Sequence, residues 1–171
     1  DFKRPLNERA VFEMKREAAG ILSTAGMRLD WRDASRAADA SFPDLVVFTF
    51  KGNCAVEPEP APPLYDELGP LAVTRTANGA IQPFGEVDCG RVAASVRSAM
   101  WGGDFGRRDE LLGRALGRVV AHELVHMLTK SGEHSREGVQ RSALSGKQLI
   151  ADALPLSALD IDRLRREFER R

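Results

Sequence analysis

The chain has no net charge and no long apolar run. Its 25 lysines and arginines balance 25 aspartates and glutamates, so the overall charge favours neither nucleic acid nor an anionic membrane as a partner. No stretch approaches the roughly 20 apolar residues that a membrane-spanning helix needs. With 43% hydrophobic and 29% charged residues in 171, we expect one soluble globular domain without nucleic-acid or membrane partners. We also expect a monomer.

Cysteine is scarce, with only Cys54 and Cys89. A disulfide between them would stabilise the fold by roughly 3–4 kcal/mol in the chain-entropy model. The alternative is a pair of free thiols in a cytosolic protein. We expect the bridge, and with it an exported protein, either secreted or periplasmic. The chain starts at Asp1 without an initiator methionine or a signal peptide, which we interpret as a processed or trimmed form.

Histidine is also rare, and its three copies are clustered. His122 and His126 stand four residues apart, and His134 follows eight residues later. In a helix, positions i and i+4 point to the same side, so the first two imidazoles can bind one Zn²⁺. His134 can supply a third nitrogen and leave a fourth position open for water and substrate, as in catalytic zinc sites. Glu123, between the first two histidines, can reach a water there.

The surrounding residues predict that this helix is buried. Residues 116–128 are apolar on nearly all sides. Two buried imidazoles and a carboxylate without partners would cost roughly 1–3 kcal/mol per group, and more for the charge. A bound metal removes that cost. The alternative is an exposed, charged turn of an ordinary helix, which the apolar neighbours disfavour.

Three segments have helical patterns. Residues 8–25 carry apolar side chains at three- and four-residue steps, with Gly26 at the expected stop. A long helix over about 107–129 bears the histidines, and Gly132 follows where a helix stop is expected. From residue 156 a third helix is expected, with Ser157 as its N-cap.

Strand patterns occupy the first half of the chain. Residues 27–32 alternate apolar with polar, as a half-buried strand does. The nearly continuous apolar run at 45–50 predicts a central strand. Residues 57–63 contain four prolines, which predicts an exposed loop.

A hairpin is predicted after that loop. Residues 71–76 and 79–84 have strand patterns on either side of Asn78-Gly79, a strong tight-turn signal. Pro83 cannot donate to a ladder, which favours an edge position for the second strand.

The order of these elements resembles the metzincin clan of zinc endopeptidases. The resemblance is most specific over residues 116–138, which read LGRVVAHELVHMLTKSGEHSREG, and extends more loosely to 159–168. His134-Ser135 followed by Gly138 matches the H-S-x-x-G run of many metzincins.

The resemblance implies an α+β fold. It has a small mixed twisted sheet, an N-terminal helix and a long buried zinc-binding helix, followed by a short C-terminal subdomain ending in a helix. We expect residues 1–171 to form a single catalytic domain. Residues 1–130 would be its upper part with the sheet and the active-site helix, and residues 131–171 its lower part with the third ligand.

The sequence departs from the family pattern H-E-x-x-H-x-x-G-x-x-H. Thr129 stands at the glycine position, Gly132 at the third-histidine position, and His134 comes two residues late. Metzincins carry a methionine in a turn beneath the zinc, but none occurs after Met127, and Gln140 stands where it would fall. An acidic third ligand, as in thermolysin-like enzymes, is the alternative to His134. The candidates for it are Glu133, Glu137 and Asp152.

The residues and the resemblance predict a zinc-dependent metalloendopeptidase with one catalytic Zn²⁺ and a peptide or protein substrate. Zinc would lower the pKa of its bound water towards roughly 7. Glu123 would act as general base and then protonate the leaving amine. An extended substrate would pair with the predicted edge strand, unless that edge is simply protected. The expected substrate-binding residues are Gly79, Ala80, Ile81 and Gln82.

Two other functions remain open at this point. One is a catalytically weakened, zinc-stabilised binding module derived from a protease. The other is a hydrolase that acts on a different amide.

Overall fold

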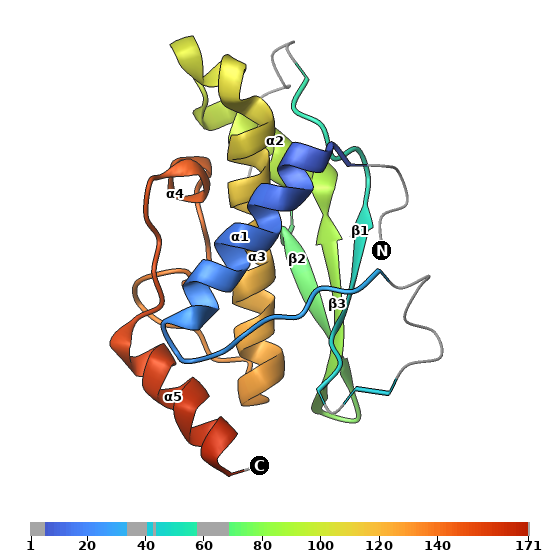
Figure 1. Cartoon of the computed structure of the whole chain (residues 1–171), viewed down its shortest axis with the longest axis vertical. Helices are drawn as coiled ribbons and strands as arrows, with labels where there is room; N and C mark the ends of the chain where they lie inside the picture. Colours follow the sequence, from blue (N-terminus) through green and yellow to red (C-terminus); the bar gives the residue numbers. More distant parts are fainter. Residues whose placement is uncertain (1–5, 34–40, 43, 58–68, 171) are drawn as a thin grey trace.

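The structure is a computed structural model that describes residues 6–33, 41–42, 44–57 and 69–170. The described part has five α-helices and one three-stranded mixed sheet, which confirms the predicted α+β class. Figure 1 shows α1, α3, α4 and α5 on one side of the sheet. Among the described residues, no helix combines the length and the apolarity that a membrane span requires.

Helix α3 (Arg108–Thr129) is the central element and bears the histidine pattern, as predicted. Most of its side chains are buried, because it contacts the sheet and each of the other helices. It ends at Lys130, which has a left-handed conformation (φ 52°) and stands two residues before the predicted stop at Gly132.

Helix α1 (Glu8–Ser23) confirms the predicted N-terminal helix, and Gly26 follows it with a φ of 85°. It lies directly against α3 because two glycines of α3 face it. A Cβ on Gly113 would lie 2.5 Å from the carbonyl oxygen of Ala10, and one on Gly117 would lie 2.7 Å from that of Met14. The two backbones therefore approach as closely as only glycine allows.

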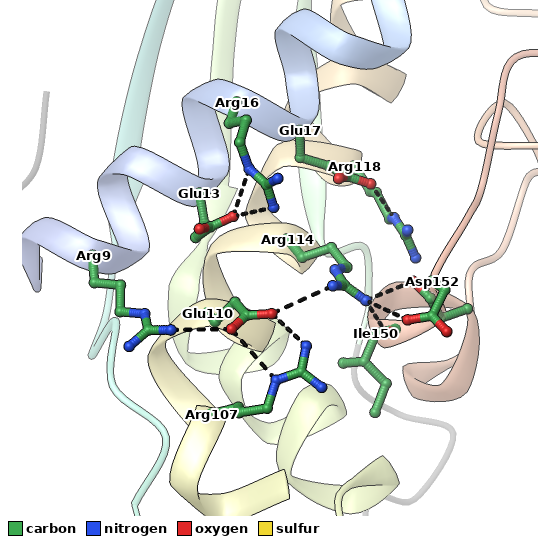
Figure 2. Close-up of polar contacts among 11 residues, drawn as sticks. Arg9, Glu13, Arg16, Glu17, Arg107, Glu110, Arg114, Arg118, Ile150 and Asp152 are labelled. Carbon is green, nitrogen blue, oxygen red and sulfur yellow. Dashed lines mark hydrogen bonds and ion pairs between the residues drawn. The ribbon is translucent and has the colours of Figure 1, made fainter.

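Charged side chains extend this seam between α1 and α3 (Figure 2). Arg118 is fully buried, and its Nε donates to Glu17 at 2.7 Å while its Nη1 donates to the carbonyl oxygen of Gln148 at 2.6 Å. Arg114 donates to the carbonyl oxygen of Ile150 at 3.0 Å. These arginines attach α1 and the α4 region to α3, the helix that carries the candidate site.

Three shorter helices complete the fold. Helix α2 (Cys89–Ala99) follows the sheet directly, and α4 (Gly146–Ile150) packs against it. Helix α5 (Ala158–Glu169) has Ser157 as its N-cap, as predicted, because the Ser157 side chain accepts from the backbone N–H of Asp160.

The predicted disulfide between Cys54 and Cys89 is present, with a Cα–Cα distance of 4.7 Å. It ties the segment after the first strand to the start of α2. A disulfide suggests an oxidising, extracellular environment, because cytosolic thiols are kept reduced.

The sheet has the order β1-β3-β2, with β1 (Val47–Lys51) parallel and β2 (Ala72–Ala77) antiparallel to β3 (Ala80–Asp88). The run at 45–50 does form a strand, but the prediction of a central position is wrong. Among the described residues β1 pairs with β3 alone, and the alternate burial of Phe48 and Phe50 shows that one face of the sheet is covered.

The predicted hairpin is present, with left-handed conformations at Asn78 and Gly79 in its turn. Its second strand, however, is the central one, so the predicted edge position is wrong. Pro83 is tolerated there because β1 pairs only from Phe84 onward, and the β2 ladder is irregular between Thr74 and Thr76.

Two further predictions concern the strand at 27–32 and the loop at 57–63. Residues 27–32 form no regular secondary structure, because no neighbouring strand pairs with them in the described part of the chain. The predicted loop at 57–63 lies outside the described residues, apart from Glu57.

Candidate metal centre

The structure brings all three histidines together. The ring centroids of His122 and His126 lie 4.8 Å apart, and His134 lies 5.1 Å from the first and 4.8 Å from the second. Their metal-binding nitrogens all lie within 4.8 Å of one another. Three histidines this close together could hold a metal ion.

Hydrogen bonds fix the tautomers of the two helical histidines. Nδ1 of His122 lies 2.9 Å from the carbonyl oxygen of Val139, and Nδ1 of His126 lies 2.7 Å from that of Ser131. A carbonyl oxygen can only accept, so each Nδ1 carries the proton. Each neutral ring is then left with a lone pair on Nε2, the atom that a metal would bind.

The two Nε2 atoms face each other at 3.1 Å. Two lone pairs at that distance repel, because no proton lies between them. Nitrogens at two corners of a zinc tetrahedron, each about 2.0–2.1 Å from the ion, are about 3.3 Å apart. The spacing of the His122 and His126 nitrogens therefore fits a metal ion held between them.

Burial favours the neutral form of His122 and of His134. It lowers the pKa of His122 to about 4, although the hydrogen bond to the Val139 carbonyl favours the charged ring. Burial also lowers the pKa of His134. A neutral imidazole is the form that binds metal, so protons compete little with a metal at neutral pH.

A single loop, residues 131–141, supplies nearly everything around the two helical histidines. Ser131 and Val139 provide the carbonyl oxygens, and His134 provides the third ring. The loop closes through a hydrogen bond from the backbone N–H of Ser135 to the carbonyl oxygen of Gln140, 2.9 Å long. His134 and the carbonyl oxygens that hold the other two rings are thus parts of one loop.

Helix α5 anchors this loop. Asp160 is fully buried and accepts from the hydroxyls of Ser135 and Ser157, each at 2.6 Å. A Cβ on Gly138 would lie 2.4 Å from the carbonyl oxygen of Pro155, so only glycine fits there. The exposed ring of His134 is therefore held through its neighbour Ser135.

Glu123 follows His122 on α3 and is 6% exposed. Its Oε2 accepts from the hydroxyl of Thr74 at 2.5 Å. Burial raises the pKa of Glu123, and the Thr74 hydrogen bond opposes that shift. Thr74 could not be predicted from the sequence, because it stands 49 residues away from Glu123 and has no local signal.

Gly85 of β3 lets the sheet lie close to α3, so that Thr74 of β2 reaches the Glu123 carboxylate. It pairs with Thr74 across the sheet, and a Cβ on it would lie 2.5 Å from Phe48 and 2.8 Å from Met127 of α3. The missing side chain lets α3 pack close to the sheet at the level of Thr74.

Gln140 is 1% exposed and lies against His126. Its Nε2 is 3.0 Å from Nε2 and 3.3 Å from Nδ1 of the His126 ring. Because these two ring nitrogens flank one carbon, an atom close to both lies over the ring face. Gln140 therefore packs against one of the three histidines that could hold a metal.

The predicted substrate-binding residues lie in the turn and at the start of β3. The edge position that motivated their choice is wrong, and the strand residue that contacts Glu123 is Thr74 of β2. Their role in substrate binding stays a prediction. These residues are Gly79, Ala80, Ile81 and Gln82.

The acidic alternatives to His134 do not join the cluster found among the described residues. Glu133 is paired with Arg163 at 2.9 Å, and Asp152 with Arg114 at 3.3 Å. Glu137 is exposed. The geometry therefore favours His134 as the third donor.

No family model matches the sequence, and neither a curated protein nor a solved structure matches it.

Proposed function

We propose that this chain is a zinc-dependent metalloendopeptidase of a metzincin-like type. The observation that carries the proposal is the pair of Nε2 lone pairs, 3.1 Å apart, with a buried carboxylate one residue from His122. The described cluster contains three protein donors, which would leave one of zinc's four positions for water or substrate. An open position is typical of catalytic zinc sites.

Glu123 is the general base in this proposal. Bound zinc would supply a water of lowered pKa and polarise the scissile carbonyl. Glu123 takes the proton from the attacking water and returns it to the nitrogen of the leaving amine. Its burial favours the protonated state, which assists the second of these transfers, and Thr74 holds the carboxylate in one orientation.

We place the substrate along β2, the edge strand next to the base. A peptide in extended conformation can add to an exposed edge through backbone hydrogen bonds. Within the described part of the chain, β2 pairs with β3 on one side only, and its Thr74 contacts Glu123. A peptide bound along this edge would therefore lie beside the general base.

Glu123→Gln tests the proposal. With one equivalent of zinc, the wild-type protein should cleave casein or members of a mixed peptide library. The variant should keep its zinc and lose about 10²–10⁴-fold in turnover, because a positioned general base contributes that much. Glu169→Gln, an exposed change at the end of α5, serves as the matched control and should leave turnover unchanged.

Two outcomes would contradict the proposal. A Glu123→Gln variant as fast as the wild type would exclude Glu123 as the base. A zinc-bound wild type that binds peptides without cleaving them would instead support the binding module.

A further inference from the structure

We infer that the carboxamide of Gln140 positions the metal-binding face of His126, so that this chain uses an amide as the floor of its metal site. The inference rests on the proposed metal centre. It concerns the side chain of Gln140 alone, because its backbone carbonyl already has a separate task in closing the loop at Ser135.

Two contacts fix the orientation of the His126 ring. The His126 ring is held in its own plane by the hydrogen bond from Nδ1 to the Ser131 carbonyl. That bond still allows the ring to tilt. The amide nitrogen of Gln140, over the ring face at 3.0–3.3 Å, blocks the tilt. Together the two contacts aim the Nε2 lone pair towards His122.

The side-chain oxygen of Gln140 lowers the stability of the fold. The Oε1 atom of Gln140 is buried and has no hydrogen-bond partner among the described residues. An unsatisfied buried polar atom lowers the stability of the fold, and methionine or leucine in place of Gln140 would avoid that cost. A buried group that lowers stability in this way points to a role in the site rather than in the core.

Gln140 lies between the loop at 131–141 and helix α3. Gln140 is the residue at which the histidine loop meets both other parts of the site. Its backbone oxygen accepts from Ser135, next to His134, and its side chain packs on His126. Gln140 therefore connects His134 on the loop with His126 on α3.

Gln140→Met and Gln140→Leu test the inference, since both fill a similar volume without polar atoms. Zinc affinity is measured by competition with a chromophoric chelator. The visible absorption of the Co²⁺-substituted protein and the thermal unfolding of the metal-free protein are recorded alongside. Gln148→Met, which alters the cap of α4 and contacts none of the histidines, is the control.

We expect two effects of opposite direction. The metal-free Gln140 variants should be at least as stable as the metal-free wild type, because no buried oxygen is left unpaired. Their zinc dissociation constants should rise about 10–100-fold, the usual effect of removing a group that supports a ligand, and the Co²⁺ bands should shift. The Gln148→Met control should bind zinc like the wild type.

Other results would overturn the inference. If Gln140→Met and Gln140→Leu bind zinc and show Co²⁺ spectra like the wild type, Gln140 only fills space, and the proposed metal centre stands. If the variants lose stability without any change in zinc affinity, the same conclusion holds. If the wild-type protein itself binds no zinc, both the inference and the proposed function fail.

Discussion

At the residue scale, the pair of Thr74 and Glu123 joins the sheet to the chemistry. The Thr74 hydroxyl is 2.5 Å from the carboxylate; Glu123 is buried and Thr74 is partly buried. In the proposed mechanism Thr74 does not touch the reacting atoms. It is a positioning residue that acts through Glu123.

Thr74→Val keeps the shape of the side chain and removes the hydroxyl. We expect zinc content to stay the same and kcat to fall about tenfold or more, because a hydrogen bond to a charged group contributes about 1.5–3 kcal/mol. Steady-state peptide cleavage with parallel metal analysis measures this. Thr76→Val, an exposed change on the same strand, should have no effect. A loss of zinc in Thr74→Val would show that Thr74 supports the metal and not the base.

At the element scale, the approach of α1 to α3 positions the helix that carries two ligands. Gly113 and Gly117 of α3 face α1 and leave no room for a Cβ. Gly20 of α1 differs, because a Cβ there would meet nothing within 4 Å. The chain thus offers a matched pair of helical glycines.

Gly117→Ala should lower the free energy of unfolding by about 1–3 kcal/mol, because the new Cβ forces the helices apart. Gly20→Ala should raise it by about 0.5–1 kcal/mol, because alanine favours the helix. Urea unfolding of the metal-free protein measures both. Equal effects of the two substitutions would show that α1 does not pack against Gly117.

Glu110 makes the stability of the contact between α1 and α3 depend on pH. It accepts hydrogen bonds from Arg107, Arg9 and Arg114 (Figure 2). The hydrogen bond from Arg107 comes first among the causes that lower the pKa of Glu110 below its ordinary value of 4.5, and burial opposes it. A carboxylate with a lowered pKa stabilises the fold above its unfolded pKa, and this contribution is lost as the pH falls through the folded value.

Glu110→Gln should therefore destabilise the protein at pH 7, by about 0.5–1 kcal/mol for pairs this close to the surface. The difference from the wild type should shrink as the pH falls below 4.5. Thermal unfolding across pH 3–7 checks this. Asp109→Asn removes the same charge one residue earlier and is the control. A difference that does not change with pH would contradict the account.

The elements also show what the sequence could predict. Helices α1 and α3 and the Ser157 cap follow from local periodicity and end signals, so they were predicted nearly to the residue. Strand neighbours depend on distant pairing. The alternation at 27–32 reports burial on one side but not whether another strand pairs there, and it therefore predicted a strand that does not exist.

The candidate site also contains residues that the sequence could predict and residues that it could not. The cluster of three histidines could be predicted, because a helix brings His122 and His126 together and His134 follows only eight residues later. The role of Glu123 stays a prediction. Thr74 could not be predicted, since its contact depends on the sheet packing against α3. Gln140 was placed by the family pattern only, and its contact with His126 depends on how the loop at 131–141 folds back.

At the scale of the whole molecule, the disulfide and the histidine cluster tie separate regions to a common core. The bridge from Cys54 to Cys89 joins the sheet to α2, and the loop at 131–141 joins α3 to α5. A metal bound in the folded state alone would stabilise the whole fold by mass action, about 2.7 kcal/mol at a free concentration 100 times its dissociation constant.

The most direct test of the account is the zinc content and ligand set of the purified protein after equilibration with excess zinc at pH 7. We predict one ion per chain, with X-ray absorption showing three imidazole nitrogens at about 2.0–2.1 Å. Replacing His122, His126 or His134 by alanine should each reduce the content sharply. A chain that stays free of metal, or that binds zinc equally well without these histidines, would contradict the central claim.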